Sequence, residues 1–373
     1  MIQKERLIKL LSQLIAFNSE NPNSDEYAIG CFVHRYLQKL GINSRIYEFK
    51  KRRLNVVANI GPSLAERSLL ITPHLDTVPA GKNWKTNPFQ AVIKGNKIYG
   101  LGASDCKGNL AVALEVIRSL VEEKIPLQYN LVFAATANEE SGSEFGLKTL
   151  LEKAIIRTTE AIVLDSDNFK IVITQKGLLH IKISVWGKRA HGAYPWLGMN
   201  AILIMKNILN EICNKKIPYT PNPFLRAPTI NIGTIHGGDK VNIVAPFCEA
   251  ELDIRFLPGQ KPEDYLTVIK KICKRYAKKF SIEVEGVQKP YAISINHPLV
   301  KGLKKAAKFV GVPSYCTGSE GATVITFFQQ YNISAIATGY GAEGSAHCVN
   351  EYAKINDLYQ GAKILKNFLS SWH

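Results

Sequence analysis

The segment Leu69-Leu70-Ile71-Thr72-Pro73-His74-Leu75-Asp76 carries a short apolar run that ends directly before two polar side chains. An apolar run of this length, stopped by proline, predicts a buried strand at 68–72. Similar runs predict strands at 44–49, 55–60, 129–135 and 161–164. Helical periodicity predicts helices at about 3–16, 25–40, 109–123 and 148–154. This alternation of strands and helices indicates an α/β sheet with helices on both faces.

The pattern changes near Gly177 and returns after Pro290. Between them the predicted order is strand, helix, strand, strand, helix, strand, which is typical of a ferredoxin-like unit. Its strands are expected at 180–185, 229–235, 248–256 and 281–285, and its helices at 200–214 and 263–279. A helix at 298–310, a strand at 334–338 and a helix from about 356 resume the first pattern. The expected fold class is therefore α/β, with a mixed-sheet domain at 1–176 and 290–373 and an inserted βαββαβ domain at 177–289.

The composition is that of an ordinary globular protein, with 46% hydrophobic and 21% charged residues. No window approaches 18 consecutive apolar residues, and the first residues form an amphipathic helix and not a signal peptide. We therefore expect no membrane association and a cytoplasmic location. The seven cysteines are scattered without a C-x-x-C pair, which argues against disulfides and against a structural cysteine-zinc site.

The net charge of +16 raises the question of a nucleic-acid partner. The basic residues are dispersed along the chain, and the densest stretch lies on the polar face of the predicted helix 263–279. No nucleic-acid-binding motif is present. A positive field that attracts anionic substrates accounts for the charge, so we expect no nucleic-acid partner.

Metal-competent side chains follow several predicted strands, at the edge where open α/β sheets bind ligands. In a strand-like segment His74 and Asp76 point the same way, so Asp76 could orient a metal-bound imidazole. The adjacent Glu139 and Glu140 repel each other, so both are solvated at a loop tip, or one binds a metal while the other is a general base. Two histidines with several carboxylates suit zinc. The complete set of these candidates is His74, Asp76, Asp105, Glu139, Glu140, Asp165 and His347.

The segments around these residues, in this order and spacing, resemble a family of two-metal hydrolases. The family includes acetylornithine deacetylase, succinyl-diaminopimelate desuccinylase, aminoacylase and glutamate carboxypeptidase, and the resemblance covers nearly the whole chain. It implies two zinc ions per subunit, for which cobalt or manganese could substitute. Asp105 would bridge the ions, while His74 with Asp165 would complete one site and Glu140 with His347 the other.

The resemblance also implies that Glu139 is the general base acting on the bridging water and that Asp76 supports His74. A cis peptide is expected at Asp105–Cys106. The segment 187–201 resembles the family's lid motif, whose histidine, here His191, reaches the partner subunit's active site and steadies the oxyanion. The expected assembly is accordingly a homodimer formed through the lid domain at 177–289.

Four further residues are expected at the substrate by the same resemblance: Asn242, Arg255, Gly318 and Ser319. Asn242 and Arg255 would hold a substrate carboxylate, and the loop with Gly318 and Ser319 would lie beside the substrate. Other interpretations remain open, since Arg255 could instead pair with Asp253 or Glu251, and His191 could be a loop histidine without a task.

The predicted function is metal-dependent hydrolysis of the amide bond of an N-acyl amino acid. The alternative is a di- or tripeptidase, or a carboxypeptidase, of the same family. Asp165 favours this alternative, because deacylase branches commonly carry glutamate there and dipeptidase branches carry aspartate. A scaffold that has lost catalysis is disfavoured, because Glu139 and His191 are both present.

Overall fold

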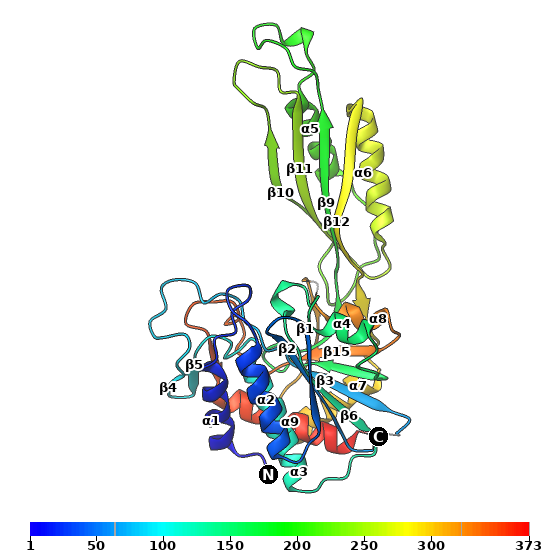
Figure 1. The fold of residues 1–373 in the computed structure, drawn as a ribbon. Coiled ribbons are helices and arrows are strands. Elements are labelled where there is room, and N and C mark those ends of the chain that lie inside the picture. The colour runs from blue at the N-terminus through cyan, green and yellow to red at the C-terminus, as the bar shows by residue number, and fades with distance from the viewer. Residues whose placement is uncertain (63–64, 322, 373) are drawn as a thin grey trace. The chain divides into compact units, whose positions relative to one another are not determined.

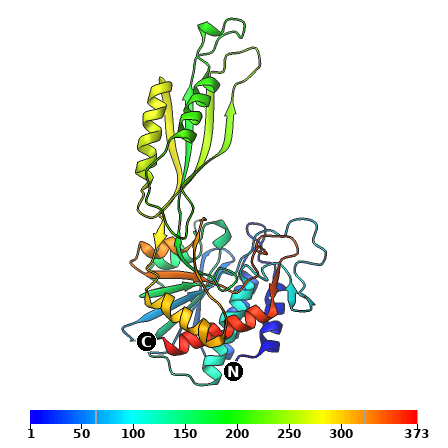
Figure 2. The same ribbon diagram turned by 180° about the vertical axis from the view of Figure 1, so that it is seen from behind.

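The chain forms two compact units in the computed structural model, which describes residues 1–62, 65–321 and 323–372 (Figures 1 and 2). The large unit contains Met1–Ile173, Ile293–Thr317 and Phe327–His373. The small unit contains Thr174–Ala292 and also the short segment Gly318–Thr326. Within the described ranges, no helix combines the length and the apolar character needed to cross a bilayer.

A mixed sheet forms the centre of the large unit. The strand order is β1-β2-β6-β3-β7-β15-β8, and the central strands β6, β3, β7 and β15 are parallel to one another. The bounds are β1 (Ser44–Lys50), β2 (Arg53–Ile60), β3 (Ser68–Thr72), β6 (Asn130–Ala135), β7 (Glu160–Val163), β8 (Ile171–Gln175) and β15 (Ser334–Thr338). β13 (Tyr291–Ala292) and β14 (Cys316–Ser319) pair with β8, in which the border between the units falls. The predicted mixed-sheet α/β class is confirmed.

The central strands are apolar because both faces of the sheet are covered. Leu69, Leu70 and Ile71 of β3 have no exposed surface, as expected for a parallel strand between layers of helices. α2 packs against β1 and β2, whereas α3 contacts α1 and α9. The helices of the large unit are α1 (Lys4–Ile15), α2 (Tyr27–Lys39), α3 (Lys107–Glu122), α4 (Leu147–Glu152), α7 (Pro298–Val310) and α9 (Ile355–Ser371), and the border between the units falls within α8 (Ile325–Gln329).

A three-stranded sheet in the large unit was not predicted. Its strands are β4 (Val92–Lys94), β5 (Lys97–Tyr99) and β16 (Tyr352–Lys354), in the order β16-β5-β4. Strands of three residues are too short to show an alternating pattern. Their pairing joins the C-terminal part of the chain to the loop that precedes α3.

The small unit has the predicted βαββαβ order, and its antiparallel sheet runs β10-β11-β9-β12. Residues of β11 alternate between buried and partly exposed, so one face of the sheet packs under the two helices. The elements are β9 (Gly177–Trp186), α5 (Ala201–Asn214), β10 (Thr229–Gly237), β11 (Phe247–Phe256), α6 (Pro262–Tyr276) and β12 (Lys279–Gln288). This arrangement confirms the ferredoxin-like fold class of the inserted segment.

Candidate metal centre and active site

The parallel strands bring the candidate residues of the large unit to one edge of the sheet. His74 follows β3, the pair Glu139 and Glu140 follows β6, and Asp165 follows β7. Because β6, β3 and β7 are parallel neighbours, the residues after their carboxyl ends meet at the same edge. Asp105 comes from the loop before α3.

Asp105 stands between the two histidines. Its Oδ1 lies 2.9 Å from His74 Nε2, and its Oδ2 lies 3.2 Å from His347 Nε2. His347 Nε2 is also 3.2 Å from Glu140 Oε1, and Asp165 Oδ1 is 3.8 Å from His74 Nε2. The side chains thus form two groups of possible ligands that share Asp105. The Asp105–Cys106 peptide is cis, as the resemblance implies.

Cys106 is a further member of the first group that sequence analysis did not include among the candidate residues. Its thiol is buried and donates a hydrogen bond to the carbonyl of Leu164 at 2.8 Å. Burial raises the pKa of Cys106 to about 11, so the thiol is neutral at physiological pH in this structure.

The carboxylates of the site concentrate negative charge in a buried place. Burial and neighbouring carboxylates raise the pKa of Glu139 well above its usual value, and they also raise the pKa of Asp165. Hydrogen bonds with Asp105 and Glu140 raise the pKa of His347 to about 11. Such a site stabilises cations, and its imidazole and carboxylate donors fit divalent metal ions.

Asp76 contacts both His74 and the turn that carries the two glutamates. His74 Nδ1 lies 2.9 Å from the backbone carbonyl of Asp76 and 3.6 Å from its carboxylate, within ion-pair distance. The carboxylate also accepts hydrogen bonds from the backbone N–H groups of Glu139 (3.0 Å) and Glu140 (3.1 Å). It therefore holds the short 3₁₀ turn η1 (Glu139–Ser141) in place.

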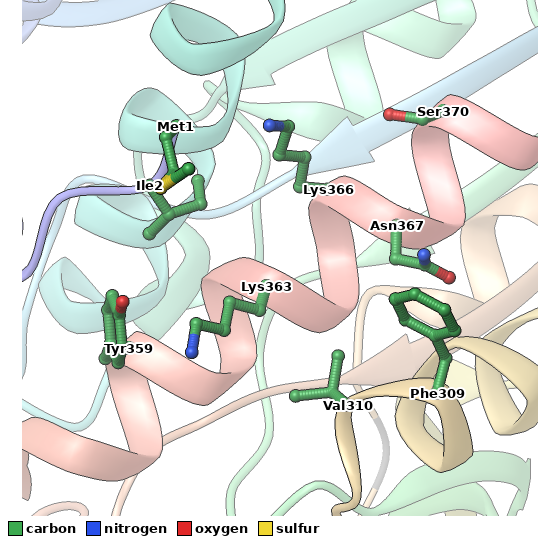
Figure 3. A pocket seen from close by; sticks show the side chains of 9 residues that line it. All are labelled: Met1, Ile2, Phe309, Val310, Tyr359, Lys363, Lys366, Asn367 and Ser370. Carbon is green, nitrogen blue, oxygen red and sulfur yellow. The ribbon is translucent and has the colours of Figure 1, made fainter.

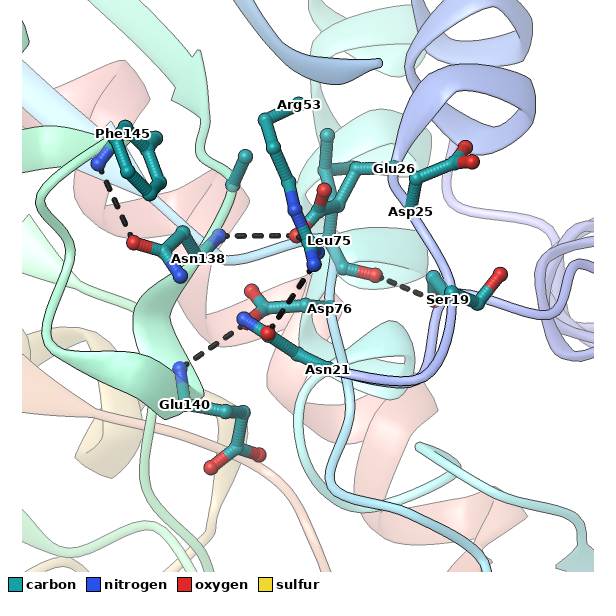
Figure 4. A network of polar contacts seen from close by, with 12 residues as sticks. Ser19, Asn21, Asp25, Glu26, Arg53, Leu75, Asp76, Asn138, Glu140 and Phe145 are labelled. Carbon is teal, nitrogen blue, oxygen red and sulfur yellow. Dashed lines mark hydrogen bonds and ion pairs between the residues drawn. The ribbon is translucent and has the colours of Figure 1, made fainter. Parts of the chain in front are cut away.

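A buried polar network supports this turn, and sequence analysis missed it (Figure 4). Asn21 Nδ2 donates to Asp76 Oδ2 at 3.0 Å, and Arg53 donates to Asn21 Oδ1 at 3.3 Å. Arg53 Nη1 and the backbone N–H of Asn138 both donate to Glu26 Oε1, at 2.8 and 3.1 Å. Glu26 is fully buried and lies three residues before Ile29, on the apolar face of the predicted helix. A carboxylate at such a position indicates a buried polar contact, and this was the feature of the sequence from which the network could have been predicted.

The other predicted residues belong to the small unit. Exposed His191 forms an isolated β-bridge with Ile243, and its Nδ1 accepts a hydrogen bond from the Ala193 N–H at 3.0 Å. Asn242 is exposed, and its carbonyl accepts a hydrogen bond from Gly192. Arg255 of β11 forms two hydrogen bonds to the carboxylate of Asp253, at 2.6 and 2.9 Å. The structural pairing of Arg255 that sequence analysis left open is thus present.

Gly318 and Ser319 lie at the end of β14, in the small unit. A Cβ atom at Gly318 would come within 2.5 Å of Leu225 Cδ2 and of the Phe224 carbonyl, so only glycine fits there. The hydroxyl of Ser319 donates a hydrogen bond to the carbonyl of Gly321 at 2.9 Å.

A pocket of about 560 Å³ in the large unit contains none of the predicted residues (Figure 3). It lies among the N-terminus, α7 and α9, and two of its basic groups, the Met1 amino group and Lys366, pair with Glu123. Its lining consists of Met1, Ile2, Phe309, Val310, Tyr359, Lys363, Lys366, Asn367 and Ser370.

Known proteins are similar to this chain in sequence and in fold. Residues 70–371 match the model of peptidase family M20/M25/M40. A metallohydrolase of Methanocaldococcus jannaschii is 31% identical over 98% of this chain and 99% of its own length. A succinyl-diaminopimelate desuccinylase of Orientia tsutsugamushi is 28% identical over 99% of this chain and 97% of its own.

A solved structure extends the likeness to the fold. The aminopeptidase PepT of Bacillus cereus superimposes with a TM-score of 0.83 at 24% identity, over 99% of this chain and 98% of that chain. The match to the family model covers most of the sequence, and the possible ligands lie together as a metallohydrolase requires. The chain belongs to peptidase family M20/M25/M40 and is a metallohydrolase that acts on amide or peptide bonds.

Proposed function

We propose that this enzyme removes the acyl group from an N-acyl amino acid by hydrolysis at a centre of two divalent metal ions. The metal that we expect there is zinc. One observation carries the proposal: the two carboxylate oxygens of Asp105 each face a different histidine. The similarity to a desuccinylase over the whole chain supports the deacylase activity.

His74, Asp105 and Asp165 would hold one ion, and Asp105, Glu140 and His347 the other. Cobalt or manganese could substitute, because carboxylate-rich sites accept several divalent ions. When bound, the ions supply Lewis acidity that polarises the scissile carbonyl and makes water a better nucleophile.

Glu139 is the proposed general base and then the general acid. Its carboxylate takes a proton from the attacking water while the water oxygen forms a bond to the carbonyl carbon. The carbon–nitrogen bond then breaks, and Glu139 returns the proton to the leaving amine. In the metal-free protein, burial and nearby carboxylates raise the pKa of Glu139, and a carboxyl group with a raised pKa keeps a proton more readily.

Residues of the small unit are proposed to bind the substrate. His191 would donate a hydrogen bond to the developing oxyanion, and Gly318 and Ser319 would line the bound substrate. Arg255, with Asn242, would take a substrate carboxylate. The two hydrogen bonds to Asp253 use Nε and Nη2 of Arg255. These bonds occupy only part of the five N–H donors of the guanidinium, and the side chain is 27% exposed.

The variants Arg255→Lys and Arg255→Ala test the carboxylate anchor. Lysine cannot reproduce the planar fork, so both variants should lose at least tenfold in kcat/KM and should lose the preference for a free over an amidated carboxylate. An arginine that only pairs with Asp253 would give a lower melting temperature in Arg255→Ala with an unchanged carboxylate preference. That result would remove Arg255 from the substrate site.

The proposed assembly is a homodimer formed through the small unit, and the proposed location is the cytoplasm. All seven cysteines are free, as expected in a reducing compartment.

Peptide hydrolysis is the second candidate function. Asp165 favours it by the resemblance to dipeptidases and tripeptidases, and the fold is similar to that of an aminopeptidase. The two functions differ in the acyl side of the substrate, because an aminopeptidase requires a free α-amino group where a deacylase accepts a plain acyl group.

A matched pair of substrates separates the two functions in the zinc-loaded enzyme. α-N-Acetylornithine and α-N-glycylornithine differ only by the amino group of the glycyl residue. A deacylase should cleave the acetyl compound, or the succinyl compound of diaminopimelate, at least tenfold faster in kcat/KM than the glycyl compound. A reversed preference would establish the peptidase, and no cleavage of any of them would contradict both.

A further inference from the structure

Glu351 is a buried carboxylate that the proposed mechanism does not use. It is 2% exposed and accepts hydrogen bonds from three backbone N–H groups of the loop that carries Asp105. Oε2 accepts from Gly102 at 2.7 Å, while Oε1 accepts from Ser104 at 2.8 Å and from Asp105 itself at 2.9 Å. One side chain therefore fixes the backbone of this loop at several points.

The pairing of β5 with β16 explains how Glu351 reaches this loop. Tyr352 is the register partner of Tyr99, so the next pair along the ladder is Glu351 with Gly100. The Gly100 N–H donates to the Glu351 carbonyl at 3.0 Å, which extends the ladder by one residue. The side chain of Glu351 is thereby presented to the residues that follow Gly100.

The loop needs such support because its backbone is unusual. Gly102 has a φ of +79°, a left-handed conformation, and a Cβ there would lie 2.8 Å from Thr77 Cγ2. The N–H groups of this loop point into a buried region, where unpaired donors are costly. A second hydrogen bond joins the loop to the segment that leads to Glu351, because the Ala342 N–H donates to Ser104 Oγ at 2.9 Å.

We propose that Glu351 is a positioning residue of the metal centre, which sets the place of the shared ligand Asp105 relative to His347. His347 lies four residues before Glu351 in the same segment, so this carboxylate couples a ligand of the second group to the ligand common to both. The inference rests on the proposed two-metal function. Outer partners of metal ligands typically change metal affinity by about 10- to 100-fold when they are lost.

The ionised form of Glu351 is the form that the loop requires, since all three partners are donors. Burial raises the pKa of Glu351 to about 7, and the backbone hydrogen bonds from Asp105, Gly102 and Ser104 act in the opposite direction. Glutamine in its place would keep one acceptor oxygen but would turn an NH₂ group toward a backbone donor.

Glu115→Gln provides a matched control for Glu351→Gln. Glu115 is also fully buried, and it accepts three hydrogen bonds, from the Gln3 N–H and from two nitrogens of Arg6. It lies in α3, eight residues beyond the first residue of that helix, which is about 12 Å along the helix axis. Its loss should affect stability without affecting the ligands.

The experiment measures zinc binding to the metal-free full chain by titration calorimetry, the absorption spectrum of the cobalt-loaded protein, and the melting temperature of each variant. Glu351→Gln should lose at least tenfold in affinity for one or both ions and should change the cobalt spectrum. Glu115→Gln should bind zinc within twofold of the native protein although its melting temperature falls. Glu351→Asp, which keeps the charge on a shorter side chain, should show the same loss and serves if the glutamine variant does not fold.

Zinc affinity of Glu351→Gln or Glu351→Asp within twofold of native would overturn the inference, and so would an equal loss in Glu115→Gln. A native protein that binds no zinc would instead contradict the proposed function, so the two failures are distinguishable.

Discussion

At the scale of single residues, the site depends on carboxylates that bind backbone instead of metal. Asp76 holds the backbone of Glu139 and Glu140, and Glu26 holds the backbone of Asn138. Charged acceptors make the stronger kind of hydrogen bond, so these three contacts restrict the turn that carries the proposed base. Asn138 has a left-handed φ of 62°, a conformation that persists where the surroundings impose it.

Glu139→Gln should lower kcat by at least a thousandfold while both metal ions remain bound. The amide has the shape of the carboxylate but cannot accept the proton of water. Activity assays combined with metal analysis check this expectation. The matched change one residue later, Glu140→Gln, should instead weaken the binding of one ion, and near-native turnover of Glu139→Gln would exclude Glu139 as the base.

Glu26 should make the stability of the protein depend on pH. Burial first, and then the charge of Asp76, raise its pKa from 4.5 to about 7. Because the pKa of Glu26 is raised in the folded state, the contribution of Glu26 to the free energy of unfolding is fully present below pH 4.5. This contribution is lost as the pH rises through 7. The shift corresponds to on the order of 3 kcal/mol, at about 1.4 kcal/mol per pKa unit.

The variant Glu26→Gln removes this titration and keeps an acceptor for Arg53. Relative to the native protein, it should gain about 3 kcal/mol in free energy of unfolding between pH 4.5 and pH 8. Urea unfolding of both proteins at the two pH values measures the difference. A constant difference between the proteins would show that Glu26 does not titrate in this range.

At the scale of elements, the sheet of the small unit has an edge strand, β10, that suits self-association. β10 has a strand neighbour only on the β11 side among the described residues, and edge strands readily pair with another chain. Leu203 of α5 is 57% exposed and Ile235 of β10 is 50% exposed. Exposed apolar side chains beside an unpaired edge are typical of protein interfaces.

Leu203→Glu should convert the proposed dimer into a monomer, because burying a charge at an apolar interface is costly. Light scattering gives the mass of the particle. The monomer should also lose most of its turnover if His191 acts in the site of the partner subunit. Phe309→Glu is the matched control, since Phe309 is 79% exposed on α7 of the large unit. A monomeric native protein would refute this interface.

At the scale of the whole molecule, folding gathers negative charge that metal ions would neutralise. Burial, followed by neighbouring charges, raises the pKa of Glu139 and of Asp165, and hydrogen bonds raise the pKa of His347 to about 11. Each of these groups has a raised pKa, so each contributes stability that is lost as the pH rises. The metal-free protein should therefore become less stable from pH 5.5 to pH 8.

Zinc should stabilise the protein more at pH 8 than at pH 5.5, because metal ions displace protons from the ligands at low pH. Melting temperatures of zinc-loaded and chelator-treated protein at the two pH values give this difference. An equal gain at both pH values would mean that these groups are not the ligands.

The sequence by itself determined the main elements, the confirmed fold class and the candidate ligands. Apolar runs and helical periods depend on residues a few positions apart, so β3, β6 and α3 could be predicted from short segments. Polar residues after parallel strands could be predicted to meet, because the sheet aligns the ends of its strands. The cis peptide at Asp105 came from the family resemblance alone.

Only the tertiary structure decided which side chains support those ligands. Glu351 lies 246 residues from Asp105, and Glu26 lies 112 residues from Asn138, so no local pattern connects them. Partners so far apart are brought together by strand pairing, as with β5 and β16, whose three-residue strands carry no periodic signal. The same reason explains α6, which ends at Tyr276 and not at the predicted residue 279, because Lys279 already pairs with Trp186 of β9.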